Sequence, residues 1–564
     1  MTDLKKRNSL KLFTAASASL GLLSVSGCQS VTPLPVSAKD ADDLRQWQQA
    51  DQIIAAIKPV KFPDRSFSIT DFGAAAKAGF DNTAAIAAAI AACAAAGGGR
   101  VLIPGGRFET GAIHLKSNVN LHLADDTVLS FYTDREHYLP YVMTRWEGVE
   151  LMGYSPLIYA YQQENIALTG NGILEGNGAV DAWWPWKGQW ERRNWEYDAS
   201  VDQVKTRSPL FEMAERGVPV SERVFNENFL RPPFIQPYGC KRVLIEGVTI
   251  RNSPFWLINP VLSEDVIVRN VNCISYGPNS DGCNPESCNR VLIENCLFDT
   301  GDDCIALKSG RNNDGRRLAT PVQNVVIQDC IMRAGHGGVV MGSEISGGAR
   351  NIFARRCRMS SPNLARGIRI KTNSVRGGLI ENVYIRDIEI GEVRDAIVIN
   401  FFYEEGDAGN FMPQVNNLHI SNLTVQKAQR AFELRGFERA PISGVTLHHV
   451  QFNNTAALGV LENIVATCDQ APPWTFGVLE LMRKGMSDAQ MEQAEGFTRM
   501  MMGPVAQAIM TPIMVVIICI PVSVCHQVST MGQFFLPICS LYQFHASSLI
   551  GSPTEPKTCK ELKS

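Results

Sequence analysis

The sequence predicts an all-β protein, a right-handed parallel β-helix (a solenoid) with an N-terminal capping helix. A short apolar phrase recurs from about residue 241 at intervals of 23 to 35 residues, which is typical of a solenoid in which each repeat forms one coil. No long helical pattern separates these runs, so leucine-rich repeats and α/β barrels are disfavoured. The anchors of the phrase are Val243, Val266, Val291, Val325, Ile352, Val383, Leu418 and Val445.

The N-terminus has the pattern of an export signal. Four basic residues precede an apolar stretch over 12–25, which is about as long as the core of a signal peptide and short for a membrane span. The stretch ends in Val-Ser-Gly-Cys28, which resembles a bacterial lipobox. We therefore expect a signal peptide over 1–28, lipidation of Cys28 and a periplasmic, outer-membrane or extracellular location. An ordinary secretory signal is the alternative.

A short tether over 29–40, within a tether and N-terminal segment over 29–64, is expected to lead into a β-helix domain over 65–467. The capping helix should begin at Asn82 or Thr83, run to about Ala96 and end at the glycines that follow, where it would cover the open end of the solenoid. The irregular, Trp-rich region 131–235 is expected to form early coils with large loops.

Composition excludes some functions. The 564-residue chain has 53 Lys and Arg against 56 Asp and Glu, a net charge of −3, which argues against a general nucleic-acid binder. Of 15 cysteines, Cys296, Cys330 and Cys357 each fall five residues after an anchor. Their equal phase predicts a stacked ladder of buried free thiols. No His/Cys cluster has zinc-like spacing, so no metal cofactor is expected.

Charged residues also recur in phase with the anchors. Residues at one phase of successive coils become neighbours in space, so one face should carry three carboxylates, an imidazole and two cations. Carboxylates placed this close raise at least one pKa, which supplies an acid and a base at one pH, as glycosidic cleavage requires. Turn ladders of Asp or a solvated basic face would explain single residues, but not the shared phase. The residues are Asp281, Asp302, Asp303, His336, Arg369 and Lys371.

Four motifs then resemble the signatures of glycoside hydrolase family 28, the polygalacturonase family, and they occur in the family's order. The resemblance covers about residues 65–465. It includes the N-terminal phrases around Asp71-Phe72-Gly73 and Pro104-Gly105-Gly106, which are similar to those of bacterial members. The four motifs are Asn279-Ser280-Asp281, Gly301-Asp302-Asp303, Gly335-His336-Gly337 and Arg369-Ile370-Lys371.

The resemblance implies inverting hydrolysis of α-1,4 galacturonosyl bonds in the pectin of cell walls. Asp302 would be the general acid, Asp281 and Asp303 would activate water, and His336 would tune the acid. The substrate-binding residues implied are Asn279, Arg369, Lys371 and Tyr403. A polysaccharide or oligogalacturonide substrate is the expected partner.

Two features depart from this pattern. Ser280 and Asn284 stand where many members have Thr and Asp, and little effect is expected from either. Carboxylates on adjacent coils would also lie closer than the roughly 6.5–9.5 Å usual in inverting enzymes. We give the family resemblance more weight than this spacing.

Other functions are considered beside this one. Rhamnogalacturonan or xylogalacturonan hydrolysis is the alternative within the family. A calcium-dependent pectate lyase and a non-catalytic β-helix binding module are less favoured, because the carboxylates share a face with His336. The long 131–235 region favours a closed cleft and exo action.

The C-terminal segment 468–564 does not follow the repeat. It contains an apolar, nearly uncharged stretch over 504–524 whose length suits a bilayer, although its prolines weaken a helix. A membrane anchor, a buried cap and foreign sequence are the three interpretations. We favour a segment without a catalytic role.

Overall fold

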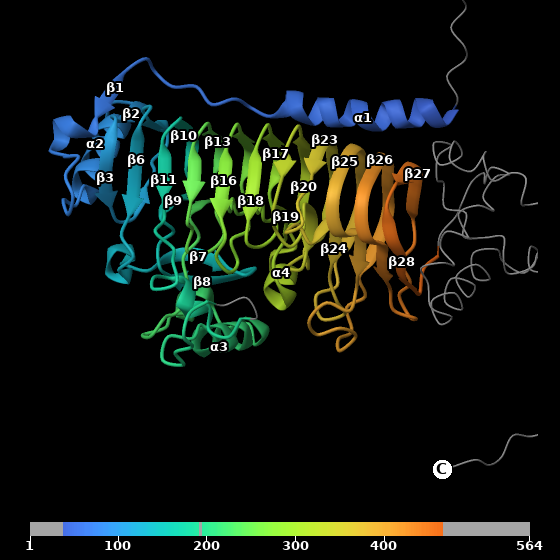
Figure 1. The fold of residues 1–564 in the computed structure, drawn as a ribbon. Coiled ribbons are helices and arrows are strands. Elements are labelled where there is room, and N and C mark those ends of the chain that lie inside the picture. The colour runs from blue at the N-terminus through green and yellow to red at the C-terminus, as the bar shows by residue number, and fades with distance from the viewer. Residues whose placement is uncertain (1–37, 191–193, 466–564) are drawn as a thin grey trace, which may run out of the picture. The chain divides into compact units, whose positions relative to one another are not determined.

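A computed structural model describes residues 38–190 and 194–465. The predicted signal peptide with Cys28 and the C-terminal segment 468–564 lie outside the described residues. Successive coils follow one another from left to right in Figure 1, and the strands of each coil pair in parallel with those of the next. This arrangement confirms the predicted parallel β-helix. In the part of the chain that is described, no helix has the length and apolar character needed to cross a bilayer.

The anchors of the sequence repeat pair with one another from coil to coil and so mark the register of the sheet. Val243 pairs with Val266, which pairs with Val291, and the same continues without a break to Val445. These side chains are mostly fully buried, because each points into the solenoid and packs on the equivalent residue of the next coil. The repeat is thus explained by one stacked row of aliphatic side chains.

The first coils contain short strands. They pair coil to coil as β1–β2–β5–β10 and β3–β6–β11, with a smaller sheet of β4, β9 and β12 and an antiparallel β7–β8 hairpin. Their bounds are β1 Ser66–Ser68, β2 Gly99–Ile103, β3 Gly106–Thr110, β4 Ile113–His114, β5 Val119–Leu123, β6 Thr127–Phe131, β7 Val142–Trp146, β8 Val149–Gly153, β9 Ile158–Tyr161, β10 Glu164–Gly170, β11 Ile173–Glu175 and β12 Ile235–Tyr238.

Later coils repeat three strand positions until the strands lengthen and bend around the solenoid. Their bounds are β13 Lys241–Glu246, β14 Thr249–Arg251, β15 Glu264–Arg269, β16 Asn272–Ser275, β17 Asn289–Glu294, β18 Leu297–Thr300, β19 Ile305–Leu307, β20 Val322–Gln328, β21 Ile331–Met332, β22 Val339–Gly342, β23 Ala349–Met359, β24 Arg366–Lys371, β25 Leu379–Asn400, β26 Gln414–Arg435, β27 Val445–Phe452 and β28 Thr455–Glu462.

Few helices accompany the coils. The α-helices are α1 Ala38–Ala56, α2 Thr83–Ala95, α3 Val204–Glu215 and α4 Asn312–Leu318. The 3-10 turns are η1 Ile69–Phe72, η2 Arg135–Tyr138, η3 Trp184–Lys187 and η4 Val220–Glu222.

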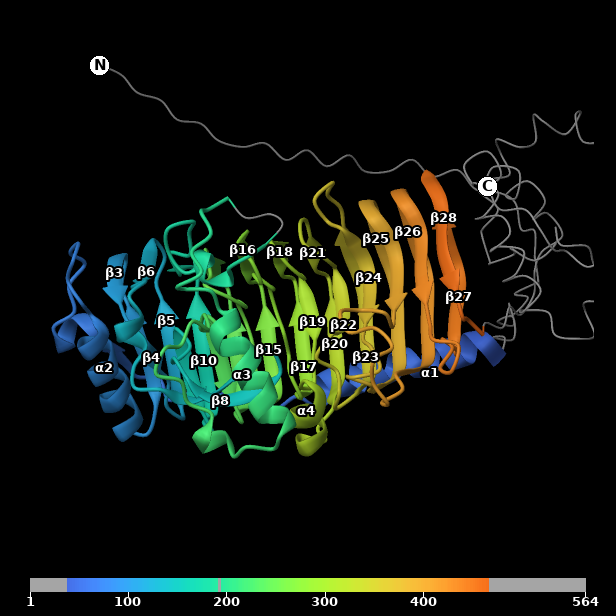
Figure 2. The ribbon, with the colours of Figure 1, turned by 90° about the horizontal axis from the view of Figure 1, so that it is seen from below.

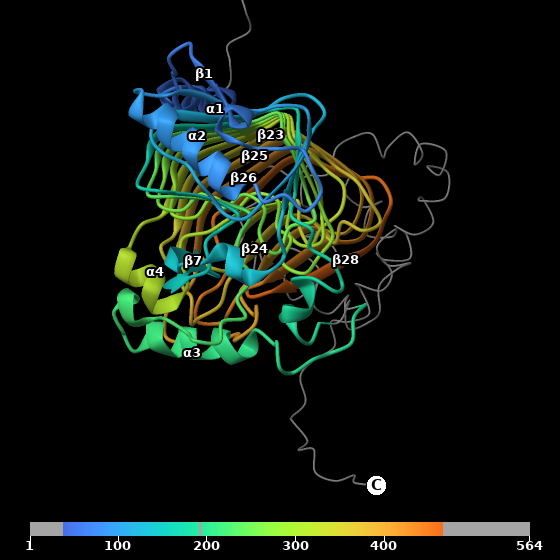
Figure 3. The ribbon, with the colours of Figure 1, turned by 90° about the vertical axis from the view of Figure 1, so that its left-hand side faces the viewer.

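Helix α2 is the predicted cap. It lies across the first coils (Figure 3) and buries Ile86, Ile90 and Cys93 against them. Asn82 occupies the N-cap position, but its side chain accepts from the Ala75 amide instead of capping the helix. The carboxylate of Asp81 accepts from the Thr83 amide in its place.

Helix α1 falls within the expected tether and N-terminal segment 29–64, and the sequence analysis did not predict it. Its second half packs on the outside of the coils, where Trp47 meets the Phe353 ring edge-on at 5.6 Å. Asp51 also accepts from Arg355 at 2.7 Å. This part of α1 therefore covers apolar side chains on the outer face of the sheet (Figure 2).

The cysteines of the described coils are buried free thiols. Burial, with Cys296 and Cys357 as neighbours, holds the pKa of the Cys330 thiol well above its usual range. The predicted ladder of interior thiols is confirmed, and these groups act as small apolar side chains.

A ladder of asparagine side chains fastens the coils at one corner. Asn324 donates to Asn289 at 2.8 Å and accepts from Asn351 at 3.0 Å. Its backbone is left-handed, with φ of 56°, a conformation that Asn tolerates better than most residues.

Replacing Asn324 by Ala is expected to lower the free energy of unfolding by about 2–4 kcal/mol, because two hydrogen bonds are lost and the left-handed backbone is strained. The midpoint of urea unfolding measures the effect. Asn324→Gly is the control, since it loses the ladder but relieves the strain, and it should lie between Ala and the wild type. Equal stability of Asn324→Ala and the wild type would contradict this account.

Candidate active site

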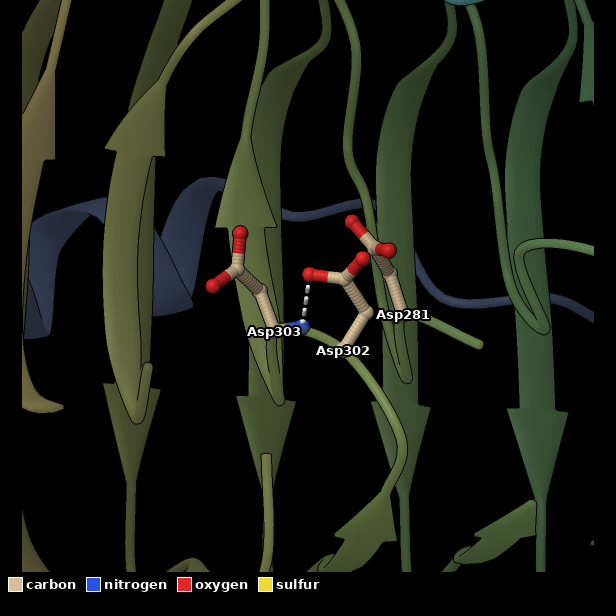
Figure 4. Close-up of side chains that lie close together, drawn as sticks. All are labelled: Asp281, Asp302 and Asp303. Atoms are coloured by element: carbon tan, nitrogen blue, oxygen red, sulfur yellow. Dashed lines mark hydrogen bonds between the residues drawn. The ribbon is translucent and has the colours of Figure 1, made fainter. Parts of the chain in front are cut away.

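Three carboxylates meet at the strand position that β19 and β22 occupy. Asp281 lies in the loop between β16 and β17, while Asp302 and Asp303 lie between β18 and β19. Each offers an oxygen within 4.8 Å of the others (Figure 4). The structure thus brings together the three aspartates that the sequence placed in phase.

Asp281 is buried and has the least compensated charge of the three. Its Oδ2 accepts from Asn284 at 2.9 Å and lies 3.7 Å from the Lys308 ammonium. Burial and the neighbouring Asp302 outweigh that cation and hold the pKa of Asp281 well above its usual range.

Asp302 is tied to the imidazole. His336 Nδ1 lies 3.0 Å from Asp302 Oδ1, and the Asp303 amide donates to the same oxygen at 2.9 Å. Burial alone would raise the pKa of Asp302, but His336, Lys371 and Arg369 outweigh it and hold that pKa far below its usual range.

Asp303 is fully buried, and both of its oxygens are engaged. Arg369 donates to Oδ1 at 3.2 Å and Lys371 to Oδ2 at 2.7 Å. Burial raises the pKa of Asp303, but Lys371 and then Arg369 more than offset it, so the pKa is lowered. The Tyr403 ring lies 5.5 Å from the Arg369 guanidinium carbon and 5.2 Å from the Lys371 nitrogen.

Asn279 stands beside this cluster in a left-handed conformation. Its side-chain oxygen accepts from Arg231 Nη2 at 2.7 Å, and Arg231 Nη1 donates to the carbonyl of Pro278 at 2.8 Å. Arg231 comes from the region 131–235 and is completely buried. It fixes the chain immediately before Asp281.

Sequence reasoning missed the supporting residues Arg231, Lys308 and Asn284. The sequence contains a signal for Lys308, since this lysine directly follows an apolar run that forms the buried strand β19. In the structure its side chain is 3% exposed. Its ammonium bonds Glu344 at 2.8 Å and lies 4.5 Å from the centre of the Trp256 ring. Asn284 was expected to have little effect, yet it donates directly to Asp281.

The region 131–235 forms a wall beside the carboxylates. The β7–β8 hairpin and α3 lie together on one side of the coils (Figure 1). Trp146 and Leu210 from this region pack with Phe255 and Trp256 of the coil before Asp281. The Gly148 carbonyl also accepts from the Arg311 amide at 3.0 Å.

A groove of about 960 Å³ adjoins the site. It passes Gly301, which directly precedes Asp302, and Ala334, which lies two residues before His336. Aromatic and basic side chains line it. These are Trp184, Trp190, Tyr276, Arg333 and Arg394. Trp183, in contrast, is buried and packs on Tyr138.

A parallel β-helix that carries a carboxylate cluster and an imidazole on one face is typical of the β-helical glycoside hydrolases. Residues 222–469 match the family model of glycosyl hydrolases family 28. The solved hyperthermoactive exopolygalacturonase from Thermotoga maritima is 40% identical, covers 75% of this chain and 94% of its own length, and has a TM-score of 0.70.

Two further relatives agree. An exo-poly-alpha-D-galacturonosidase of Dickeya chrysanthemi is 25% identical over 73% of each chain. The polygalacturonase structure from Erwinia carotovora, 20% identical over 73% of this chain and 98% of its own, shares the fold with a TM-score of 0.54. The chain belongs to glycoside hydrolase family 28, as the sequence motifs predicted.

Proposed function

We propose that the protein is an exo-acting polygalacturonase, which hydrolyses α-1,4 galacturonosyl bonds from a chain end with inversion. The observation that carries the proposal is the 40% identity to an exopolygalacturonase across 94% of that enzyme. The site supports it, because three carboxylates lie beside Arg369 and Lys371. Such cations suit a substrate with one carboxylate on each sugar.

Asp302 is proposed to protonate the leaving oxygen. His336 Nδ1 lies 3.0 Å from the Asp302 carboxylate and orients it. A bound sugar that excludes water makes the charged form of Asp302 more costly, so it favours the carboxyl form that can act as the acid. His336 thereby has a positioning and tuning role.

Asp281 and Asp303 are proposed to activate the water. Asp303 is kept ionised by Arg369 and Lys371, so it can accept a proton at acidic pH. The pKa of Asp281 is raised, so Asp281 can share this role only after it gives up its proton, which Lys308 at 3.7 Å and the hydrogen bond from Asn284 favour. The oxygens of the three carboxylates lie within 4.8 Å, which is shorter than the roughly 6.5–9.5 Å usual in inverting enzymes. Inversion is therefore proposed from the family, and the anomeric form of the first product tests it.

Exo action is supported by the wall that 131–235 builds. Glu147 at the tip of the β7–β8 hairpin accepts from Arg207 of α3 at 2.8 Å. Arg311 lies over the Phe211 ring at 4.1 Å and reaches Glu405 at 3.1 Å. This charged barrier joins the insertion to later coils and would stop a polymer from passing through the cleft.

A calcium-dependent lyase is the second candidate, because the three aspartates lie close enough to hold a metal ion. Their charge is instead compensated by protein groups. Lys308, Arg369 and Lys371 lie within 3.7 Å of carboxylate oxygens, and His336 adds a fourth partner. A cation held by these aspartates would face three resident cations, so we favour hydrolysis.

The test is digestion of polygalacturonate in the presence of a chelator. We expect galacturonate monomer or dimer from the first minutes, new reducing ends and no absorbance from unsaturated sugars. NMR of the first product reports its anomeric form, which inversion makes opposite to that of the substrate bond. A ladder of oligomers would overturn exo action, and unsaturated products or a calcium requirement would overturn hydrolysis.

Export is also proposed, from the pattern of residues 1–28. A periplasmic, outer-membrane or extracellular location would place the enzyme near a pectic polysaccharide. Lipidation at Cys28 and any membrane attachment through 504–524 are proposals from sequence alone, since both lie outside the described residues.

A further inference from the structure

Lys187 is a cation of the insertion that the proposed reaction does not use. It is the last residue of the turn η3 and is half-buried. Within the described residues its ammonium makes no hydrogen bond or ion pair. Lys187 lies in the chain between Trp184 and Trp190, which both line the groove beside the candidate site, so its partly desolvated ammonium is placed where an anionic ligand can bind it.

The protein fixes the position of this lysine. Trp184, three residues earlier, donates its indole N–H to the Ser253 carbonyl at 3.0 Å and lies directly over Gly277. The Trp186 carbonyl accepts from the Gln203 amide at 2.7 Å. Both ends of η3 are thus fastened, one of them to the coil that precedes Asp281.

The charges that face Lys187 are those of the candidate site and its wall. Glu147 and Asp302 attract it, Arg231 and Arg207 repel it, and burial is the largest influence, lowering the pKa of Lys187. Both anions already have partners, since Glu147 accepts from Arg207 and Asp302 pairs with His336. The charge of Lys187 is therefore not fully compensated by these two carboxylates, and a further anion can bind it.

We propose that Lys187 binds the carboxylate of one of the two galacturonate units that flank the cleaved bond, while Arg369 and Lys371 face the other unit. This inference rests on the proposed function. A bond protonated by Asp302 has one uronate on each side of it. Arg369 and Lys371 come from a coil after Asp302, whereas η3 is fastened to the coil before Asp281. The two sets of cations therefore approach Asp302 from opposite directions along the coils.

The test uses trigalacturonate and two derivatives, each with a single methyl ester on one or the other of the two sugars flanking the bond that the wild type cleaves. An ester cannot pair with an ammonium, so the wild type should prefer the free acid over both. Lys187→Met should lower kcat/KM on the free acid by roughly 30-fold or more and lose the preference over one ester only. Lys371→Met should lose its preference over the other.

Lys205→Met is the matched control, because Lys205 lies in the same insertion but is exposed and donates to the Ser200 carbonyl. It should keep wild-type rates and preferences. Lys187→Arg keeps the charge and should restore the preference that Lys187→Met loses.

Each other outcome decides against the inference. If Lys187→Met lowers kcat/KM equally on all three substrates, the lysine has a structural role. If it keeps the wild-type preferences, or loses the same one as Lys371→Met, it does not recognise a separate carboxylate. A wild type that fails to hydrolyse unesterified trigalacturonate would instead overturn the proposed function itself.

Discussion

Asp302→Asn is expected to lower kcat by roughly 10²–10⁴-fold, since an amide cannot protonate the leaving oxygen. KM should change little, because Asn has the same shape and its oxygen can still accept from the Asp303 amide. Initial rates of reducing-end release measure kcat, and calorimetric titration with an oligogalacturonide on the inactive variant measures binding.

Asp281→Asn is the comparison, because Asp281 holds its proton more tightly than Asp302 does. If Asp302 is the acid, an activated leaving group such as an aryl galacturonide should restore Asp302→Asn but not Asp281→Asn. Rescue of Asp281→Asn alone would transfer the acid role to Asp281. Near-native kcat in Asp302→Asn would exclude it as the acid altogether.

Lys371→Met is expected to cost about 2–4 kcal/mol of transition-state stabilisation on polygalacturonate, measured as kcat/KM, because it removes a buried charge that bonds Asp303 and is proposed to face the substrate. A solvated lysine would cost only about 0–1 kcal/mol. Lys427→Met is the control, since Lys427 is 57% exposed and pairs with Glu392 on the surface. The contrast between the two variants is measured from initial rates at low substrate concentration.

The same variant should alter the pH profile. Lys371 is the largest of the charges that lower the pKa of Asp303, against burial, which raises it. Removing Lys371 therefore raises that pKa, and Asp303 loses its charge at a higher pH. Activity that needs ionised Asp303 should then decline at a higher pH on the acidic side. An unchanged acidic limb would show that Asp303 is not required in its charged form.

Much of the fold could be predicted, because the residues that pair in successive coils of a β-helix recur at regular intervals in the sequence. Val243 to Val445 are spaced as coils, and pairing of equal side chains in the interior gives that spacing a physical cause. Helix α1 was not predicted because its segment is largely polar. Its signal was nevertheless present, since Trp47, Ala50, Ile53 and Ile57 recur at helical intervals and face the sheet.

The carboxylate cluster could be predicted for the same reason, because equal phase in successive coils means proximity. Its support could not. Arg231 reaches Asn279 from 48 residues earlier, through a region without a repeat. Arg369 and Lys371 were expected to face the substrate, and the structure shows them bonded to Asp303. A periodic pattern predicts which residues meet, but not which of several charges become partners.

The loop that carries α4 separates the anchors Val291 and Val325 by more residues than most neighbouring coils, yet the two still pair in register. Coil and loop are thus free to change independently. Insertions in the loops can accumulate over evolutionary time without moving Asp302 relative to His336. Proteins that share the same aspartates and histidine on the coils can therefore differ in how they bind a polymer, because the loops beside these residues can lengthen or shorten.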